Sequence, residues 1–135
     1  MNIDISPLGR AIDRLREAME VYGQDTTQSI IRDGLVQRFE FTYEICHKLL
    51  RRYLSENPGP PERINSMNFA DMIRISNENA LLLGDWPKWK MYRDMRARTS
   101  HSYNEAVALD VVDGIPAFLE EACYLRDRLH ERLSG

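Results

Sequence analysis

Arg96, His101 and Tyr103 form the pattern R-x4-H-x-Y, and their side chains suit chemistry at a phosphodiester without a metal ion. An arginine stays cationic and can grip two phosphate oxygens as negative charge develops. A histidine gains or loses a proton near neutral pH, so it can serve as general base or general acid. Cleavage of RNA through its own 2′-hydroxyl requires these functions. The pattern therefore predicts Arg96 and His101 as catalytic residues.

The spacing of the pair sets a condition on the local structure. On a straight α-helix, residues five positions apart are rotated by about 140°, so Arg96 and His101 would not share a face. They converge only if the helix ends or loosens between them. Thr99 and Ser100 favour such an end, because their hydroxyls compete for backbone hydrogen bonds. We expect the pair at the end of an amphipathic helix.

One chain supplies a single histidine at this site, whereas the reaction needs both an acid and a base. A two-fold dimer would bring Arg96 and His101 of both chains into one cleft and would supply both functions. The pair also has a simpler interpretation. An Arg-x4-His spacing arises by chance, and a histidine at a helix end can cap carbonyls or interact with the helix dipole.

Helical periodicity dominates the chain, and no window alternates in the manner of a strand. Ser6 and Pro7 are typical of a helix start, with Ser6 as the cap, and prolines stop the second helix at 57–61. The short connections predict an all-α, antiparallel four-helix bundle with a fifth short helix, in one domain over 1–135. The expected helices cover 6–23, about 26–55, about 68–80, 86 into the motif, and 104–133 with a bend or interruption at 114–116.

Positive charge is concentrated around the motif, although the formal net charge of the chain is −3. This distribution has two interpretations, a phosphate-facing patch or a solvated helix face. If the patch binds RNA, Arg93 and Arg98 are its candidate phosphate contacts. Aromatic residues at helical spacing in the same segment are expected in the core. Between positions 86 and 103 the cations are Lys88, Lys90, Arg93, Arg96 and Arg98, and the anion is Asp94.

No metal, cofactor or membrane segment is expected. Cys46 and Cys123 lie in apolar helical patterns without metal-ligand spacing, which indicates small buried thiols in a reduced protein. Glu40 and Glu44 stand one turn apart, as carboxylate ligands can, but no matching Glu-x-x-His sequence follows. The chain lacks a signal-like apolar start and a run of about 20 apolar residues, so a cytoplasmic protein is expected.

Four segments, distributed over positions 28–128, resemble the HEPN-domain proteins. The similarity is to the toxins encoded beside minimal nucleotidyltransferases, a group also described as nucleotidyltransferase substrate-binding proteins. Two positions depart from the family pattern: Ala97 replaces a polar residue, commonly asparagine, and His47 replaces an aromatic one. The segments are 38–50, 82–86, 89–103 and 115–119.

The resemblance implies a homodimeric ribonuclease toxin, which a nucleotidyltransferase antitoxin neutralises in a complex that could extend beyond a dimer. It also implies that this partner transfers AMP to Tyr103. An adenylate two residues from His101 would add bulk and negative charge, pair with Arg96 and obstruct the cleft. The alternative is a non-catalytic subunit that presents a nucleotide or substrate to the partner. Ala97 and the modest net charge keep this alternative open.

Overall fold

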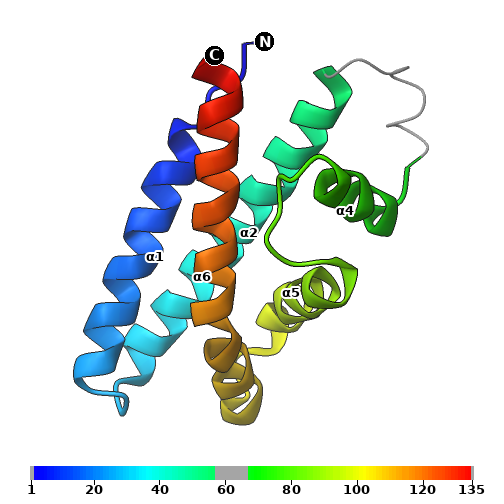
Figure 1. The fold of residues 1–135 in the computed structure, drawn as a ribbon. Coiled ribbons are helices and arrows are strands. Elements are labelled where there is room, and N and C mark those ends of the chain that lie inside the picture. The colour runs from blue at the N-terminus through cyan, green and yellow to red at the C-terminus, as the bar shows by residue number, and fades with distance from the viewer. Residues whose placement is uncertain (1, 57–66, 135) are drawn as a thin grey trace.

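The computed structural model describes residues 2–56 and 67–134, and all regular secondary structure in them is helical (Figure 1). The all-α prediction is therefore confirmed for these residues, whereas the proline-rich stop predicted at 57–61 lies outside them. The elements are α1 (Ser6–Gln24), α2 (Ser29–Glu56), α4 (Phe69–Glu78), α5 (Trp86–Arg98), the short 3-10 helix η1 (Thr99–His101) and α6 (Glu105–Ser134).

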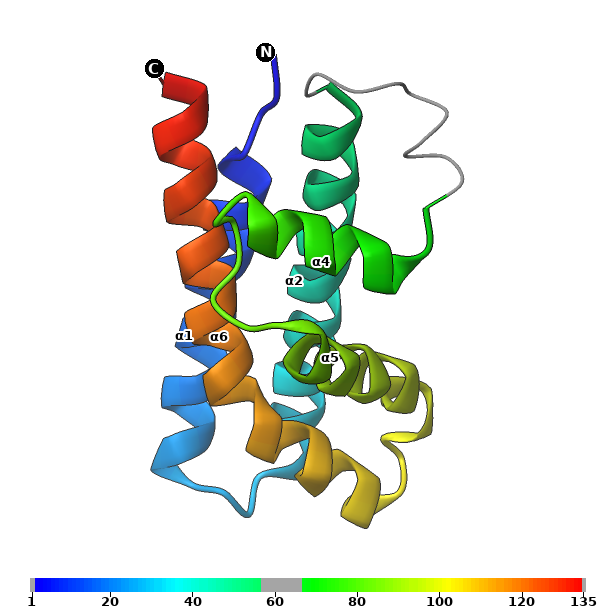
Figure 2. The same cartoon turned by 45° about the vertical axis from the view of Figure 1, so that its right-hand side comes forward.

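Three long helices, α1, α2 and α6, lie alongside one another and make up the body of the molecule (Figure 1). The shorter helices α4 and α5 cross the face of α2, and α5 also packs on α6 (Figure 2). This arrangement agrees with the expected helical bundle carrying a fifth short helix. The start of α1 and the end of α6 lie at one end of the bundle, and η1 lies toward the other end (Figures 1 and 2).

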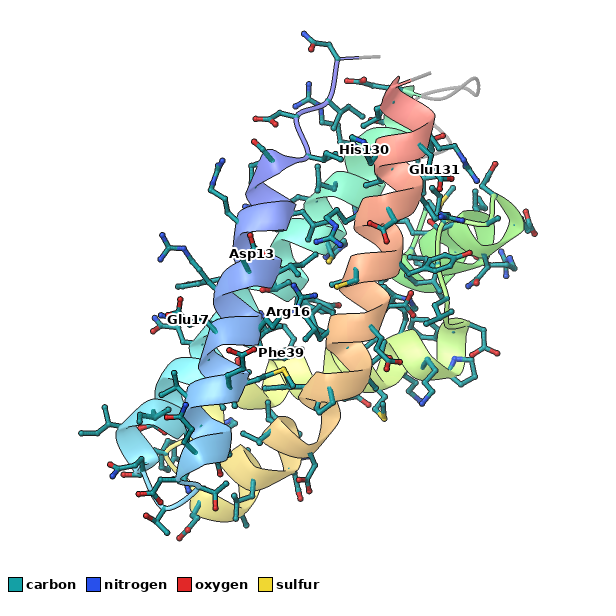
Figure 3. All side chains as sticks on the ribbon, turned by 60° about the vertical axis from the view of Figure 1, so that its left-hand side comes forward. Asp13, Arg16, Glu17, Phe39, His130 and Glu131 are labelled. Carbon is teal, nitrogen blue, oxygen red and sulfur yellow. The ribbon has the colours of Figure 1, made fainter. Side chains whose placement is uncertain are left out.

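Aromatic side chains from three helices form the centre of the core. Phe39 of α2 lies between α1 and α6 (Figure 3) and meets Phe118 edge-on, with the ring centroids 4.9 Å apart. Trp89 and Tyr92 of α5 pack against the same Phe118. Each large apolar side chain buried in this way contributes about 1.5–3 kcal/mol. The prediction that these α5 aromatics belong to the core is confirmed for Trp89 and Tyr92, while Trp86 is half-buried.

Aspartates order the chain at the start of α1 and in the turn before α2. Asp4 Oδ1 accepts hydrogen bonds from the backbone N–H and the hydroxyl of Ser6, at 2.9 and 2.7 Å. The expectation that Ser6 caps α1 was therefore wrong, because Ser6 is the first helical residue and is itself capped. Asp25 Oδ1 accepts from the backbone N–H and hydroxyl of Thr27 in the same way, in the turn that precedes α2. Helix α2 starts at Ser29, slightly later than predicted.

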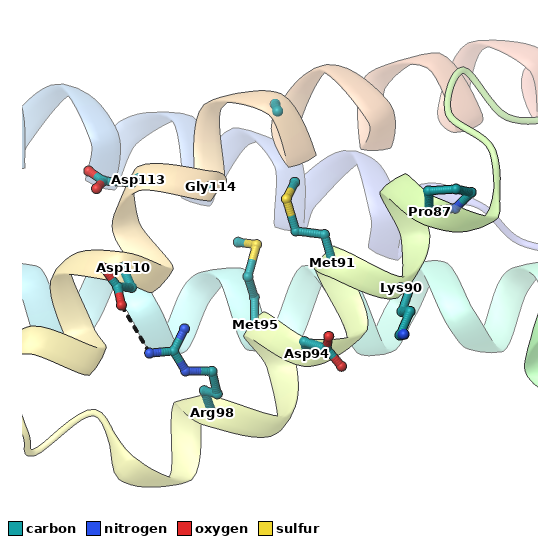
Figure 4. A pocket seen from close by; sticks show the side chains of 10 residues that line it. Pro87, Lys90, Met91, Asp94, Met95, Arg98, Asp110, Asp113 and Gly114 are labelled. Atoms are coloured by element: carbon teal, nitrogen blue, oxygen red, sulfur yellow. Dashed lines mark hydrogen bonds and ion pairs between the residues drawn. The ribbon is translucent and has the colours of Figure 1, made fainter.

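Helix α6 remains helical through 114–116 but bends there, where Pro116 lies inside the helix (Figure 2). The predicted bend is confirmed, and an interruption does not occur. Two residues before Pro116, Gly114 allows α5 to approach closely. A Cβ atom on Gly114 would lie 2.5 Å from the Sδ atom of Met95, which points toward α6 (Figure 4).

Candidate functional site

The motif lies where α5 gives way to η1, and the helix changes form between Arg96 and His101 as predicted. The Thr99 hydroxyl donates to the carbonyl oxygen of Arg96 at 2.7 Å, and the Ser100 hydroxyl donates to that of Ala97 at 3.2 Å. These hydroxyls therefore bond carbonyls of the last α5 turn, which is the competition that favours a helix end. The tighter 3-10 turn η1 then follows and ends at His101.

Two carboxylates of α2 hold the Arg96 guanidinium. Its Nε donates to Oε1 of Glu44 at 2.7 Å, and its Nη2 lies 3.3 Å from Oε1 of Glu40. Its Nη1 lies 3.4 Å from the Thr99 hydroxyl. From the sequence, Glu40 and Glu44 were considered only as possible metal ligands, and their role as partners of Arg96 was not predicted. Their one-turn spacing was the available signal, because residues four apart on a helix face the same side and can share a cation.

The contacts orient Arg96 without closing it to a ligand. A guanidinium has five N–H donors, so three contacts leave donors for a phosphate, and 30% of the side chain remains exposed. The two carboxylates partly offset its charge. However, partly exposed ion pairs of this kind contribute only about 0–1 kcal/mol each, which a doubly hydrogen-bonded phosphate can exceed. The arrangement therefore presents a positioned cation that an anionic ligand can still bind.

His101 and Tyr103 lie together at the surface beyond Arg96. Their ring centroids are 6.1 Å apart, and both side chains are exposed, Tyr103 by 87%. The backbone between them is ordered by two turn hydrogen bonds, from Ser102 N–H to the Thr99 carbonyl and from Asn104 N–H to the His101 carbonyl. A proton acceptor and an accessible phenol thus occupy one short connection between η1 and α6.

The two predicted auxiliary cations have other partners. Arg98 Nη2 lies 3.0 Å from Oδ2 of Asp110, inside a pocket of about 680 Å³ between α5 and α6 (Figure 4). The Arg93 guanidinium lies over the ring of Phe69, 5.8 Å from its centroid. Neither contact directs these arginines to Arg96 or His101. A phosphate would have to replace Asp110 or the aromatic ring to engage them.

The other candidate groups are placed as structural residues. Cys46 is buried, and burial raises the pKa of its thiol, whereas Cys123 is half-buried beside Arg16. His47 is half-buried between Tyr43 and Phe69. Within 2–56 and 67–134, no three His, Cys, Asp or Glu side chains gather as metal ligands. Over the same residues, no helix combines the length and apolarity needed to cross a bilayer.

Residues 3–131, almost the whole chain, match the family described as nucleotidyltransferase substrate binding protein like. The chain belongs to this family. A family relative from Haemophilus influenzae, described as a probable ribonuclease HepT, is 37% identical over 112 residues, which are 80% of this chain and 76% of that protein. The resemblance to HepT-like proteins is therefore confirmed.

The fold is shared with a solved member from the same species, whose structure is described as the fold of a substrate binding domain of a nucleotidyltransferase. The two structures superimpose with a TM-score of 0.88 at 30% sequence identity, over 94% of this chain and 99% of the other. The α2 helix that carries Glu40 and Glu44 and the α5 end that carries Arg96 are thus parts of a family fold.

Proposed function

We propose that this protein is a metal-independent endoribonuclease of the HepT type, the toxin partner of a nucleotidyltransferase antitoxin. The observation that carries the proposal is the Arg96 guanidinium, positioned by Glu44 and Glu40 and still partly exposed, on the helix end that also bears the exposed His101. The description of the 37% identical relative as a probable ribonuclease supports the same activity.

In the proposed reaction, His101 removes the proton of an RNA 2′-hydroxyl, and the resulting oxygen attacks the adjacent phosphorus. The bond from phosphorus to the 5′-oxygen breaks, which leaves a cyclic phosphate and a 5′-hydroxyl. Arg96 stabilises the negative charge that develops on the phosphate oxygens. The departing oxygen takes its proton from the His101 imidazolium of a second copy, so the proposal includes a two-fold homodimer. Arg93 and Arg98 would bind flanking phosphates after exchanging their present partners.

Tyr103 is the proposed site of regulation. Its exposed hydroxyl would attack the α-phosphorus of ATP held by the nucleotidyltransferase, forming a bond to AMP and releasing pyrophosphate. The new phosphodiester would lie beside His101, within reach of the positive charge of Arg96. Intact mass after incubation with the partner and ATP tests this step. Adenylate mass that appears equally on Tyr103→Phe would contradict it.

The ribonuclease proposal is tested by expressing wild type, Arg96→Ala and His101→Ala while following RNA integrity and cell growth. Loss of either side chain should abolish both RNA cleavage and growth arrest. His130→Ala, at another exposed histidine on α6, is the matched control and should behave as wild type. The proposal fails if both motif variants remain as toxic as the wild-type protein.

A second function, a non-catalytic substrate-binding subunit, is favoured by one observation. Glu44 and Glu40 already pair with Arg96, which lowers the charge available for a transition state. The substrate-binding function also agrees with the description of the solved relative as a substrate binding domain of a nucleotidyltransferase. On this hypothesis, protein freed of its partner cleaves no RNA, yet its addition stimulates nucleotide transfer by the partner enzyme. RNA cleavage by the purified protein that is lost in His101→Ala would contradict it.

A further inference from the structure

A basic groove lies between the outer faces of α1 and α2, and its cations take no part in the proposed reaction. It has a volume of about 450 Å³, and neither Arg96 nor His101 lines it. Although the chain as a whole carries a formal charge of −3, this groove is lined by several cations. They are Arg10 and Arg14 of α1 and Arg38 and Lys48 of α2.

Most of this positive charge faces solvent. Among the described residues, the structure contains no ion pair to Arg10, Arg14 or Lys48. Arg38 is shared with Glu17, 3.3 Å away, and with the Arg14 carbonyl oxygen at 2.8 Å. With one carboxylate, Glu44, against these cations, the lining of the groove is positive overall and is suited to a polyanion, whereas the motif arginines already have partners.

An exposed aromatic ring lies between the cations on the α2 side of the groove. Phe41 is 54% exposed, and it shares a helix face with Arg38 and Lys48, at spacings of three and seven residues. This face extends over about 15 Å of helix. Cations that follow a backbone, together with an accessible ring on which a base can stack, are the features of single-stranded nucleic acid sites. A duplex would leave the ring without an unpaired base.

The groove reaches the candidate site through Glu44. This residue lines the groove, and its Oε1 accepts the 2.7 Å hydrogen bond from Arg96. We infer that the α1–α2 groove binds the backbone of single-stranded RNA, with a base stacked on Phe41, and delivers the strand to Arg96. The choice of RNA rests on the proposed function, whereas the polyanion site rests on the groove itself.

The test measures binding of a short fluorescein-labelled single-stranded RNA by anisotropy, in a His101→Ala background that prevents cleavage. Arg14→Glu combined with Lys48→Glu should weaken binding at least about tenfold and lower the salt-dependence slope by about 1.4, since each phosphate contact contributes about 0.7. Lys88→Glu combined with Lys90→Glu makes the same change of net charge on exposed positions of α5 and should weaken binding far less than the groove pair does.

The aromatic contribution is tested separately. Phe41→Ala should weaken binding by about tenfold, and Phe41→Tyr should retain it, because stacking on a base is retained by either ring. The inference is overturned if the parent binds no RNA, if the groove variants bind as the parent does, or if the α5 pair weakens binding equally. It is also overturned if light scattering shows that the groove variants lose binding by changing the oligomeric state.

These outcomes are distinguishable from failure of the proposed ribonuclease. That proposal fails when Arg96→Ala and His101→Ala leave cleavage unchanged, a result that does not depend on the groove. Conversely, groove variants that bind RNA normally would refute the groove inference and leave the catalytic assignment intact.

Discussion

The Nε atom of Arg96 donates a 2.7 Å hydrogen bond to Oε1 of Glu44, which ties the end of α5 to the middle of α2. Both side chains are partly exposed, so the ion pair contributes at most about 1 kcal/mol to stability. Its larger effect is on orientation. A guanidinium on a flexible side chain is held in one place by a carboxylate from the longer, packed helix α2.

Removal of this carboxylate should lower turnover more than stability. Glu44→Ala leaves the guanidinium without its anchor, and we expect kcat on RNA to fall roughly ten- to hundredfold, the scale that misplacement of a reacting group produces. Glu44→Gln keeps an oxygen that accepts from Nε and should retain most of kcat. Steady-state cleavage assays separate kcat from KM, and thermal unfolding monitors the fold. Equal activity of the Ala and Gln variants would contradict the positioning role.

His47 should make the protein sensitive to acid. Burial lowers the pKa of His47, and the charges of Arg51 and Arg93 lower it further, against an opposing effect of Glu44. Because the folded pKa of His47 lies below the unfolded value of about 6.5, neutral His47 favours the folded state. This contribution to the free energy of unfolding is present above about pH 6.5 and is lost as pH falls through the lowered folded pKa. His47→Phe removes this dependence.

The same substitution should stabilise the fold at neutral pH. Among the described residues, the buried Nε2 of His47 has no hydrogen-bond partner, so an apolar ring in its place should raise the free energy of unfolding by about 1 kcal/mol. Urea unfolding of both proteins from neutral to acidic pH provides the measurement. The gain of His47→Phe over wild type should grow as pH falls, and parallel curves would rule out His47 as the source.

Glu121 should produce the opposite pH dependence. Burial raises the pKa of this carboxyl, although hydrogen bonds from the backbone N–H groups of Leu83 and Gly84, each 2.7 Å long, act against the rise. Its contribution to stability is fully present below the unfolded pKa of about 4.3 and is lost as pH rises through the raised folded pKa. Relative to Glu121→Gln, wild type should therefore lose stability as pH increases over this interval. A difference that is constant with pH would contradict the assignment.

Two glycine-to-alanine changes should have opposite effects on stability, because Gly114 lies where α5 and α6 approach closely and Gly34 faces open space. In Gly114→Ala the new Cβ would lie 2.5 and 2.7 Å from the Sδ and Cε atoms of the buried Met95, so the variant should lose about 1 kcal/mol of stability. In Gly34→Ala of α2 the Cβ meets nothing within 4 Å, and the better helix propensity should add about 0.5–1 kcal/mol. Chemical denaturation measures both. Stabilisation by Gly114→Ala would show that Met95 moves aside at little cost.

The helices could be predicted from the sequence because their cause is local. Leu8, Ile12 and Leu15 recur at helical spacing and are fully buried, and the hydroxyls of Thr99 and Ser100 correctly indicated the change of helix after Arg96. The cap at Ser6 was misassigned because Asp4, two residues earlier, offers a stronger acceptor at the same helix start.

The surroundings of the motif were less predictable, because its contacts join residues far apart in the chain. Arg96 and Glu44 are 52 positions apart, and only the packing of α5 across α2 brings them together. The partners of Arg93 and Arg98 arise in the same way, from α4 and α6. A count of cations along the sequence could not show that Arg93, Arg96 and Arg98 already have partners, or that the groove between α1 and α2 is lined by cations from two helices.

The position of α1's start and α6's end has a practical consequence. Both stand at one end of the bundle, while η1 lies toward the other (Figures 1 and 2). A fluorophore or an immobilisation handle attached beyond either helix would stand clear of Arg96 and His101. Surface-tethered protein can thus be challenged with RNA, or with a nucleotidyltransferase, without the support masking the motif.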